Sequence, residues 1–226
     1  MSQPEITILI PAYNEAGNIG ETLNALTKIK YAAKVIVIDD CSTDNTASLA
    51  EQYGVKVIRL PRNIGKGGAL NRGLEEVSCG IVAFLDADLK DTSREVEKLI
   101  RPVLENKADM TIAQFSSPRK KGGFGLVTNL ARMGLKLMTG LTLHSPLSGQ
   151  RVLKFEVLEA VHKKVASGFG VEVGLTIDVH RAGFRIKEIP VSMTHAETGR
   201  DIKGFMHRGK QFFDVLTVLI NKWVNK

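Results

Sequence analysis

Acidic side chains follow three of the apolar runs in the first half of the sequence. Glu15 follows the first run, Asp39 and Asp40 end the second, and Asp86 and Asp88 follow a later one. Carboxylates that lie close together repel one another unless a cation or a donor-rich ligand neutralises them. Two carboxylates one residue apart at a strand end can chelate a hard divalent cation through oxygen. We therefore predict that Asp86 and Asp88 hold a divalent cation against a diphosphate.

No glycine-rich phosphate loop follows the first apolar run, which continues as PAYNE over residues 11–15. The dinucleotide fingerprint GxGxxG and the Walker sequence are both absent at this point. A nucleotide bound here would therefore not be held by the helix N-terminus that those motifs provide.

The spacing of apolar residues predicts an α/β fold, Rossmann-like, with a mostly parallel sheet. Short β-branched runs alternate with segments of helical spacing, as in sheets covered by helices on both faces. The predicted strands of the first half are residues 6–10, 35–39, 56–60, 81–85 and 110–115, and the predicted helices are 18–28, 43–53, 66–77 and 93–106. Ligands of such sheets bind beyond the carboxyl ends of the strands, where the acidic residues stand.

The second half begins with a basic loop, SSPRKKGG, over residues 116–123. A helix over 124–138, a strand over 149–154, two helical segments and a strand over 185–193 are expected after it. With no repeat or linker in the sequence, we predict one domain over residues 1–203, its two halves meeting near residue 115.

The C-terminal segment, residues 204–226, is predicted to be an amphipathic helix. Phe205, Phe212, Leu216, Leu219 and Trp223 share one helical face, and polar and basic residues occupy the other. Two interpretations remain open: the helix docks on the core, or it lies in a membrane interface with its basic side toward the lipid headgroups.

Composition narrows the class of protein. The 226 residues are 43% hydrophobic and 24% charged, which is typical of globular proteins and excludes disordered and disulfide-scaffold classes. Two cysteines, Cys41 and Cys79, and no signal peptide or apolar stretch of membrane-spanning length predict a cytoplasmic protein. It could still lie on the cytoplasmic face of a membrane. The formal net charge of +7 suits an anionic partner.

Four segments resemble the nucleotide-sugar half of the inverting family-2 glycosyltransferases of the GT-A fold. They are ILIPAYNEAGNI, VIVIDDCSTDNT, RNIGKGGALNRGL and VAFLDADL, in the family's order and spacing. The second half matches less tightly. LSGQR over residues 147–151 is similar to a segment of the dolichol- and polyprenyl-phosphate sugar transferases, and TGR over 198–200 stands where those enzymes carry a basic acceptor motif.

The resemblance implies a role for individual residues. The nucleotide sugar would be bound by Pro11, Ala12, Tyr13, Glu15, Ile38, Asp40, Lys66, Asp86 and Ala87, with Asp40 accepting a ring N–H of the base. Asp88 and Gln150 would be catalytic, and His195 would join Asp86 and Asp88 on the metal, which the resemblance implies is Mg²⁺ or Mn²⁺. Structural alternatives remain for two of these residues, a solvated side chain for Lys66 and a structural role for His195. Asp39, which precedes Asp40, could serve in helix capping or turn formation.

The expected acceptor is a phosphate. A hydroxyl acceptor needs a general base, whereas a phosphate is already an anion at neutral pH. The segment Ser148, Gly149 and Gln150 contains no carboxylate. The phosphate would be received by the basic residues Arg119, Arg132, Arg200 and Lys203. Together with this acceptor, the resemblance implies metal-dependent, inverting transfer of a hexose from a UDP- or GDP-sugar to polyprenyl phosphate.

Other functions are weighed against this one. GFGVEVG over residues 168–174 is similar to a segment of the retaining glucosyl-phosphoglycerate synthases, in which case Glu172 and His195 would line the site and the acceptor would be small and soluble. A nucleotidyltransferase lacks its glycine-rich start here. Aromatic residues are 6% of the chain and none interleaves with the basic run at 119–121, so we expect no nucleic-acid partner. Intact acidic motifs argue against an inactive sugar-nucleotide sensor.

Overall fold

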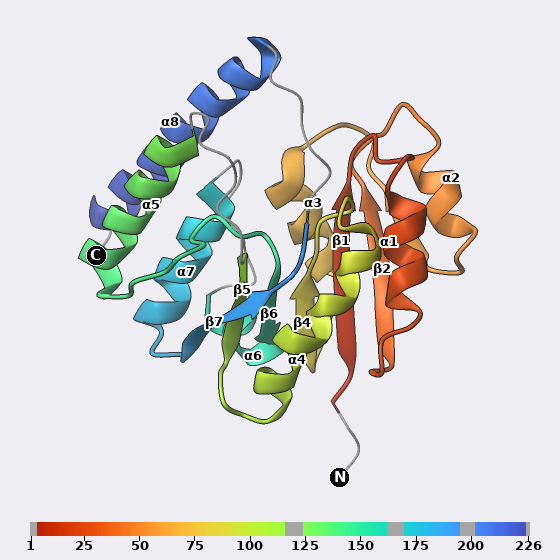
Figure 1. The fold of residues 1–226 in the computed structure, drawn as a ribbon, viewed down its shortest axis with the longest axis horizontal. Helices are drawn as coiled ribbons and strands as arrows, with labels where there is room; N and C mark the ends of the chain where they lie inside the picture. The colour runs from red at the N-terminus through yellow and green to blue at the C-terminus, as the bar shows by residue number, and fades with distance from the viewer. Residues whose placement is uncertain (1–3, 116–123, 162–169, 195–201, 225–226) are drawn as a thin grey trace.

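In a computed structural model, residues 4–115, 124–161, 170–194 and 202–224 are described. One seven-stranded sheet runs through them (Figure 1). The strands are β1 (Ile6–Ala12), β2 (Ala33–Asp39), β3 (Lys56–Arg59), β4 (Ile81–Phe84), β5 (Met110–Phe115), β6 (Arg151–Lys154) and β7 (Ile186–Val191). Their order across the sheet is β3-β2-β1-β4-β6-β5-β7. The predicted α/β class is confirmed.

The sheet is parallel except at β6, which is antiparallel to both of its neighbours, β4 and β5. Strands β1, β2, β3 and β4 pair in parallel, as do β5 and β7. Strand β6 therefore enters from the opposite direction, and the residues that precede it meet the carboxyl end of β4. This geometry brings the start of β6 to the edge where ligands bind in parallel sheets.

Helices cover both faces of the sheet. They are α1 (Ile19–Leu26), α2 (Thr46–Glu51), α3 (Gly65–Leu74), α4 (Val96–Leu104), α5 (Phe124–Thr139), α6 (Phe155–Ala160), α7 (Val171–Arg181) and α8 (Ile202–Val224). The predicted helix over 93–106 is instead a 3-10 helix, η1 (Lys90–Glu95), followed by α4. The hydroxyl of Thr92 bonds back to the carbonyl of Leu89, which favours the tighter turn.

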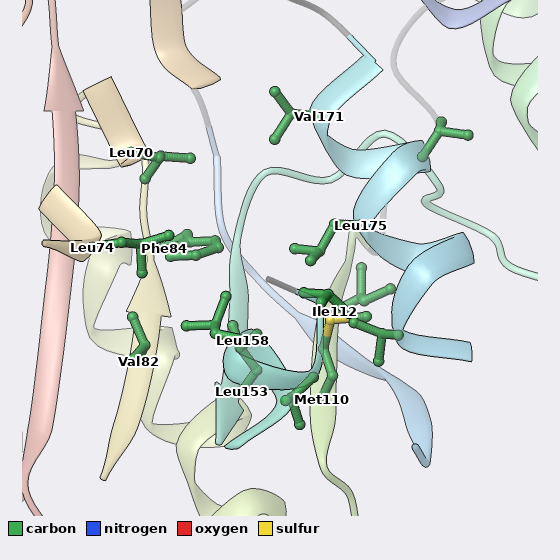
Figure 2. Close-up of a cluster of buried hydrophobic side chains, with 14 of the residues drawn as sticks. Leu70, Leu74, Val82, Phe84, Met110, Ile112, Leu153, Leu158, Val171 and Leu175 are labelled. Carbon is green, nitrogen blue, oxygen red and sulfur yellow. The ribbon is translucent and has the colours of Figure 1, made fainter. Parts of the chain in front are cut away.

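Two apolar cores lie on the two faces of the sheet. Side chains of α1, α2 and α4 form one, and side chains of α3 and α5 to α8 form the other. Figure 2 shows part of the second core, where Phe84 of β4 lies beside Leu74 of α3 and Leu175 of α7 reaches toward Ile112 of β5. The strand ends above these cores are thus held on both sides.

The C-terminal helix α8 packs against α5 and α7. Val215 and Leu219 are buried, and Phe212 is partly buried against the core. The predicted apolar face is therefore divided: Leu219 belongs to the core, whereas Trp223 is exposed. None of the helices in the described part of the chain is long and apolar enough to span a bilayer.

Candidate functional site

The acidic residues singled out in the sequence meet at one edge of the sheet, because β2, β1 and β4 are neighbours and their carboxyl ends point the same way. The segments that follow these strands contain Asn14, Cys41 and Lys90, whose φ angles are 54°, 64° and 51°. Non-glycine residues rarely adopt this left-handed conformation, and where they do, the surrounding structure must hold them. Three of the four non-glycine residues with positive φ in the described part of the chain thus lie at this edge.

The β1–β2 side of the site is formed by residues 13–16, 39–46 and 64–65. Hydrogen bonds between side chains and main chain join its loops. Asn14 N donates to the Ser42 hydroxyl (2.9 Å), Thr43 N donates to the Asn14 side-chain oxygen (2.8 Å), and Glu15 N donates to the Thr46 hydroxyl (2.7 Å). Tyr13, at the tip, is exposed. These bonds hold the loops after β1 and β2 to one another.

Two adjacent aspartates on this side have different surroundings. Asp40 is buried, and its two oxygens accept the main-chain N–H groups of Ile64 and Gly65, both at 2.8 Å. It thereby anchors the start of α3, which is the position at which a carboxylate best satisfies helix N–H groups. Asp39 is also buried, but its Oδ1 atom has no hydrogen-bond partner among the described residues. Its Oδ2 accepts only a long bond from Ser42 N (3.3 Å).

The β4–β6 side is formed by Lys66, Asp86, Gln150, Arg151 and Glu172. Antiparallel register pairs Phe84 with Arg151, and its continuation places Asp86 opposite the residues just before β6. Gln150 Nε2 donates to Asp86 Oδ2 and Lys66 Nζ donates to Asp86 Oδ1, both at 2.6 Å. Three elements far apart in sequence therefore converge on one carboxylate.

Lys66 lies between two carboxylates. Its ammonium is 2.6 Å from Asp86 Oδ1 and 3.4 Å from Glu172 Oε1, which lies in the first turn of α7. Burial by itself would lower the pKa of Lys66, but the charges of Asp86 and Glu172 outweigh it and raise the pKa above its usual value. A Cβ atom on Gly149 would overlap Nζ of Lys66. Glycine at this position therefore leaves the room that the ammonium occupies.

Arg151 is fully buried beneath this cluster, with 1% of its surface exposed. Its guanidinium donates to the carbonyls of Ser148 and Pro146 and to the hydroxyl of Thr176. Burial lowers the pKa of Arg151 to about 10, opposed by the charges of Glu172 and Glu188, so it remains a cation at neutral pH. Sequence reasoning missed this residue. The signal was a charged residue directly before the apolar pair Val152 and Leu153 at the start of the strand.

Glu15 links the two sides electrostatically. Burial raises its pKa, the hydrogen bond from Asn18 Nδ2 (2.7 Å) acts against this, and the charges of Asp88 and Asp86 raise the pKa further. The acids that follow β1 and β4 are thus close enough to repel, as the sequence predicts.

The donor set suits a hard cation. Asp86 and Asp88 offer carboxylate oxygens, and Mg²⁺ commonly binds one or two carboxylates and takes its other ligands from water and substrate phosphates. No group of three or more potential ligand residues comes together within the described ranges. His195, the predicted third ligand, lies outside those ranges. The residues present therefore fit a cation that is completed by a diphosphate.

The remaining predicted site residues are dispersed. Ala12, Ile38 and Ala87 are buried in the cores, so only their main chain can face a ligand, and Pro11 is partly buried. Arg132 is exposed on α5 and donates to the carbonyl of His144. Two of the predicted acceptor residues, Arg119 and Arg200, lie outside the described residues, as does the side chain of Lys203.

Comparison with known proteins decides the family. The model of "Glycosyl transferase family 2" matches residues 7–161. The chain belongs to glycosyltransferase family 2. It is therefore a glycosyltransferase, and the sequence-based recognition of the family is confirmed.

Relatives within the family act on different acceptors. The chain is 27% identical to the dolichol-phosphate mannosyltransferase of Pyrococcus furiosus over 97% of its own length and 64% of that enzyme's length. It is 26% identical to the undecaprenyl-phosphate mannosyltransferase of Micrococcus luteus, over 86% and 85% of the two chains. The glucosyl-3-phosphoglycerate synthase of Mycobacterium tuberculosis, crystallised with Mn²⁺, UDP and phosphoglyceric acid, superposes with a TM-score of 0.79 at 28% identity, covering 97% of this chain and 78% of that one. This similarity confirms the GT-A fold.

Proposed function

We propose that this glycosyltransferase moves a hexose from a UDP- or GDP-sugar to polyprenyl phosphate, with inversion at the sugar carbon and with Mg²⁺ or Mn²⁺ as cofactor. The observation that carries the proposal is the position of Asp86 between Lys66 and Gln150 at the carboxyl edge of the sheet. A carboxylate with an ammonium 2.6 Å from one of its oxygens and an amide 2.6 Å from the other forms a site for a charged, hydrogen-bonding ligand. A nucleoside diphosphate has this chemistry.

The β1–β2 side would hold the nucleoside. Tyr13 is exposed there, and the unpartnered Oδ1 of Asp39 can accept a ring N–H of the base. Asp40 was the residue expected for this contact, but its carboxylate already accepts two main-chain N–H groups. The proposal therefore gives the base contact to Asp39 and gives Asp40 the task of shaping the loop.

The β4–β6 side would hold the diphosphate. Asp86 and Asp88 would bind the divalent cation, which supplies Lewis-acid stabilisation of the charge on the leaving nucleoside diphosphate. Lys66 is pre-positioned as a second positive charge beside the same group. Gln150 holds the other oxygen of Asp86 and so sets the orientation of that carboxylate. The relatives crystallised with Mn²⁺ or Mg²⁺ and UDP support this cofactor and donor.

A phosphate acceptor agrees with the surroundings of the site. Gln150, beside Asp86, is an amide and cannot serve as a general base, and the carboxylate of Glu172 is ion-paired with Lys66. A phosphate oxygen can attack the sugar carbon without losing a proton, while the bond from that carbon to the nucleoside diphosphate breaks. The two relatives named for dolichol and undecaprenyl phosphate support a lipid phosphate. With such an acceptor, the reaction would take place at the cytoplasmic face of a membrane.

A small soluble phosphate acceptor is the second candidate. One observation favours it: Glu172, expected at the site only under this alternative, does lie at the site. The structural similarity to glucosyl-3-phosphoglycerate synthase points the same way.

The test is release of nucleoside diphosphate from a panel of UDP- and GDP-sugars in the presence of Mn²⁺. Each sugar is supplied with polyprenyl phosphate, with 3-phosphoglycerate or with neither. Release that depends on polyprenyl phosphate is the expected result. Release that depends on 3-phosphoglycerate alone would replace the proposal with the second candidate.

A further inference from the structure

Large apolar side chains are exposed mainly in one place, on the outer surface of α5 and α8. Seven of the ten exposed large apolar residues in the described part of the chain belong to these two helices, with exposures between 48% and 74%. They are Leu126, Met133 and Leu137 on α5, and Phe213, Ile220, Trp223 and Val224 on α8. We call this set the α5–α8 surface. Concentrated exposed apolar area of this kind marks an interaction site.

The two helices present these residues with the same spacing. Leu126, Met133 and Leu137 are separated by seven and four residues, and so are Phe213, Ile220 and Val224. This spacing places each trio along one line of its helix. The helices lie side by side at the left of Figure 1 and contact each other. Each of these two contacting helices therefore carries an exposed apolar ridge.

The packing beneath the α5–α8 surface keeps its apolar side chains exposed. On α8, Val215 and Leu219 face the core, and a Cβ atom on Gly134 of α5 would overlap the side chain of Leu219. Lys222 of α8 donates to both carboxylate oxygens of Asp178 on α7 at 2.6 Å. Since α8 is held through one face, its exposed apolar residues cannot rotate inward without breaking these contacts.

The net charge of the two helices indicates which kind of partner the α5–α8 surface binds. The sequences of α5 and α8 contain six lysines and arginines and one acid, Asp214, so the two helices carry most of the formal net charge of +7. Helices that combine exposed apolar residues with an excess of lysine and arginine suit the headgroup region of an anionic bilayer, in which they lie in the plane of the interface. A tryptophan is typical of that depth, and Trp223 is the only one in the chain.

The surface is also connected to the proposed site. The guanidinium of Arg132 on α5 donates to the carbonyl of His144, and residues 140–150 lead from the end of α5 to Gln150 beside Asp86. We infer that the α5–α8 surface binds the face of an anionic membrane and brings the site to a phosphate at the headgroup level. The inference rests on the proposed lipid acceptor for its purpose, but membrane binding is measurable without it.

The experiment is co-sedimentation of the full chain with vesicles of phosphatidylcholine, with and without phosphatidylglycerol, at low and high salt. The emission of Trp223 is recorded in parallel. We expect binding to the anionic vesicles at low salt and a blue shift as Trp223 enters the interface. The double variant Met133→Glu/Phe213→Glu should bind about tenfold more weakly or worse, because each substitution places a charge on the apolar ridge. The matched control is Asn24→Glu/Gln52→Glu, which makes the same change in net charge at exposed positions of α1 and the end of α2, across the molecule in Figure 1.

Equal binding by both double variants would overturn the inference, as would failure of the unmodified chain to bind anionic vesicles. A third outcome is that the unmodified chain binds no vesicles and sediments as a dimer, whereas the Met133→Glu/Phe213→Glu variant sediments as a monomer. The surface would then bind a second copy of the chain instead of a membrane. Transfer to a short-chain prenyl phosphate dispersed in detergent separates the two proposals. If the double variant loses vesicle binding but keeps this transfer, both the membrane-binding surface and the lipid acceptor are supported. If the unmodified chain binds vesicles but transfers sugar to no prenyl phosphate, the membrane-binding surface is supported and the proposed acceptor is wrong.

Discussion

The two sides of the site are held together by different kinds of interaction. On the β1–β2 side, side chains bond to the main chain of neighbouring loops, as Asp40 does with Ile64 and Gly65. On the β4–β6 side, charged and amide side chains bond to one another, as Lys66 and Gln150 do with Asp86. Main-chain anchors keep their geometry whether or not a ligand is present. Side-chain pairs can exchange partners when a cation or a phosphate arrives, so the two sides should respond differently to substitution.

The largest effect is expected at the aspartates after β4. Replacing Asp86 or Asp88 with alanine should reduce sugar transfer by about 10³-fold or more, because charge on the leaving diphosphate loses its counter-ion site. The fold should persist, since neither side chain belongs to the two apolar cores. Transfer rates and melting temperatures of both variants check this. Transfer within tenfold of the unmodified enzyme would show that the β4–β6 side does not hold the leaving group.

The next largest effect is expected from a substitution that displaces the Lys66 ammonium without changing Lys66 itself. Gly149→Ala should displace the Lys66 ammonium and lower transfer by about 10- to 100-fold, with a small change in stability. Gly125→Ala is the control, because no atom lies within 4 Å of the added Cβ there. If both residues act through one ammonium, the double variant Lys66→Met/Gly149→Ala should be no worse than Lys66→Met alone. Additive losses would mean that Gly149 serves some other purpose.

On the β1–β2 side, the two adjacent aspartates should separate binding from stability. Asp39→Ala should weaken nucleoside diphosphate binding by about 1–3 kcal/mol, because the base loses its acceptor. Asp40→Ala should lower the free energy of unfolding by about 1–3 kcal/mol, because two main-chain N–H groups lose theirs. Calorimetry and urea denaturation of both variants measure the two quantities. A stable Asp40→Ala protein with impaired binding would return the base contact to Asp40.

The smallest effect on transfer is expected far from both sides, at Asp109. Hydrogen bonds from Arg185 and then Lys154 outweigh burial and hold the pKa of Asp109 well below its usual 3.8. Because the pKa of Asp109 is lower in the folded than in the unfolded protein, its ionised carboxylate stabilises the fold fully above pH 3.8. This stabilisation is lost as the pH falls through the pKa of the folded state. Asp109→Asn should therefore cost about 2 kcal/mol of unfolding free energy at pH 7 and progressively less below pH 3.8, with transfer at pH 7 unchanged. Urea denaturation across this pH range checks it, and a difference that persists at low pH contradicts it.

Much of the fold could be predicted from the local pattern of apolar residues in the sequence. The β-branched runs predict β1 to β5 to within about two residues at each end, and the acids that follow them predict the functional edge. The reversal of β6 is different. Its sequence, RVLK, shows a strand but carries no information about direction, which depends on the path of the chain through α5.

The site was predictable where its contacts are local to a motif. Asp86 and Asp88 stand out by their spacing after an apolar strand. Glu172 and Arg151 do not, because their partners lie on other elements: Glu172 pairs with Lys66, and Arg151 bonds Thr176. The roles of Asp39 and Asp40 also needed coordinates, since neighbouring residues on a strand point to opposite faces and only the packing of α3 decides which carboxylate is occupied.

The central claim is that a divalent cation joins a nucleoside diphosphate to Asp86 and Asp88. Calorimetric titration of UDP and GDP, with and without Mn²⁺, into the unmodified chain, Asp86→Ala and Asp88→Ala tests it most directly. We predict that Mn²⁺ tightens binding of one of the two nucleotides to the unmodified chain and has no such effect on either variant. Metal-dependent affinity that is unchanged in both variants would contradict the assignment.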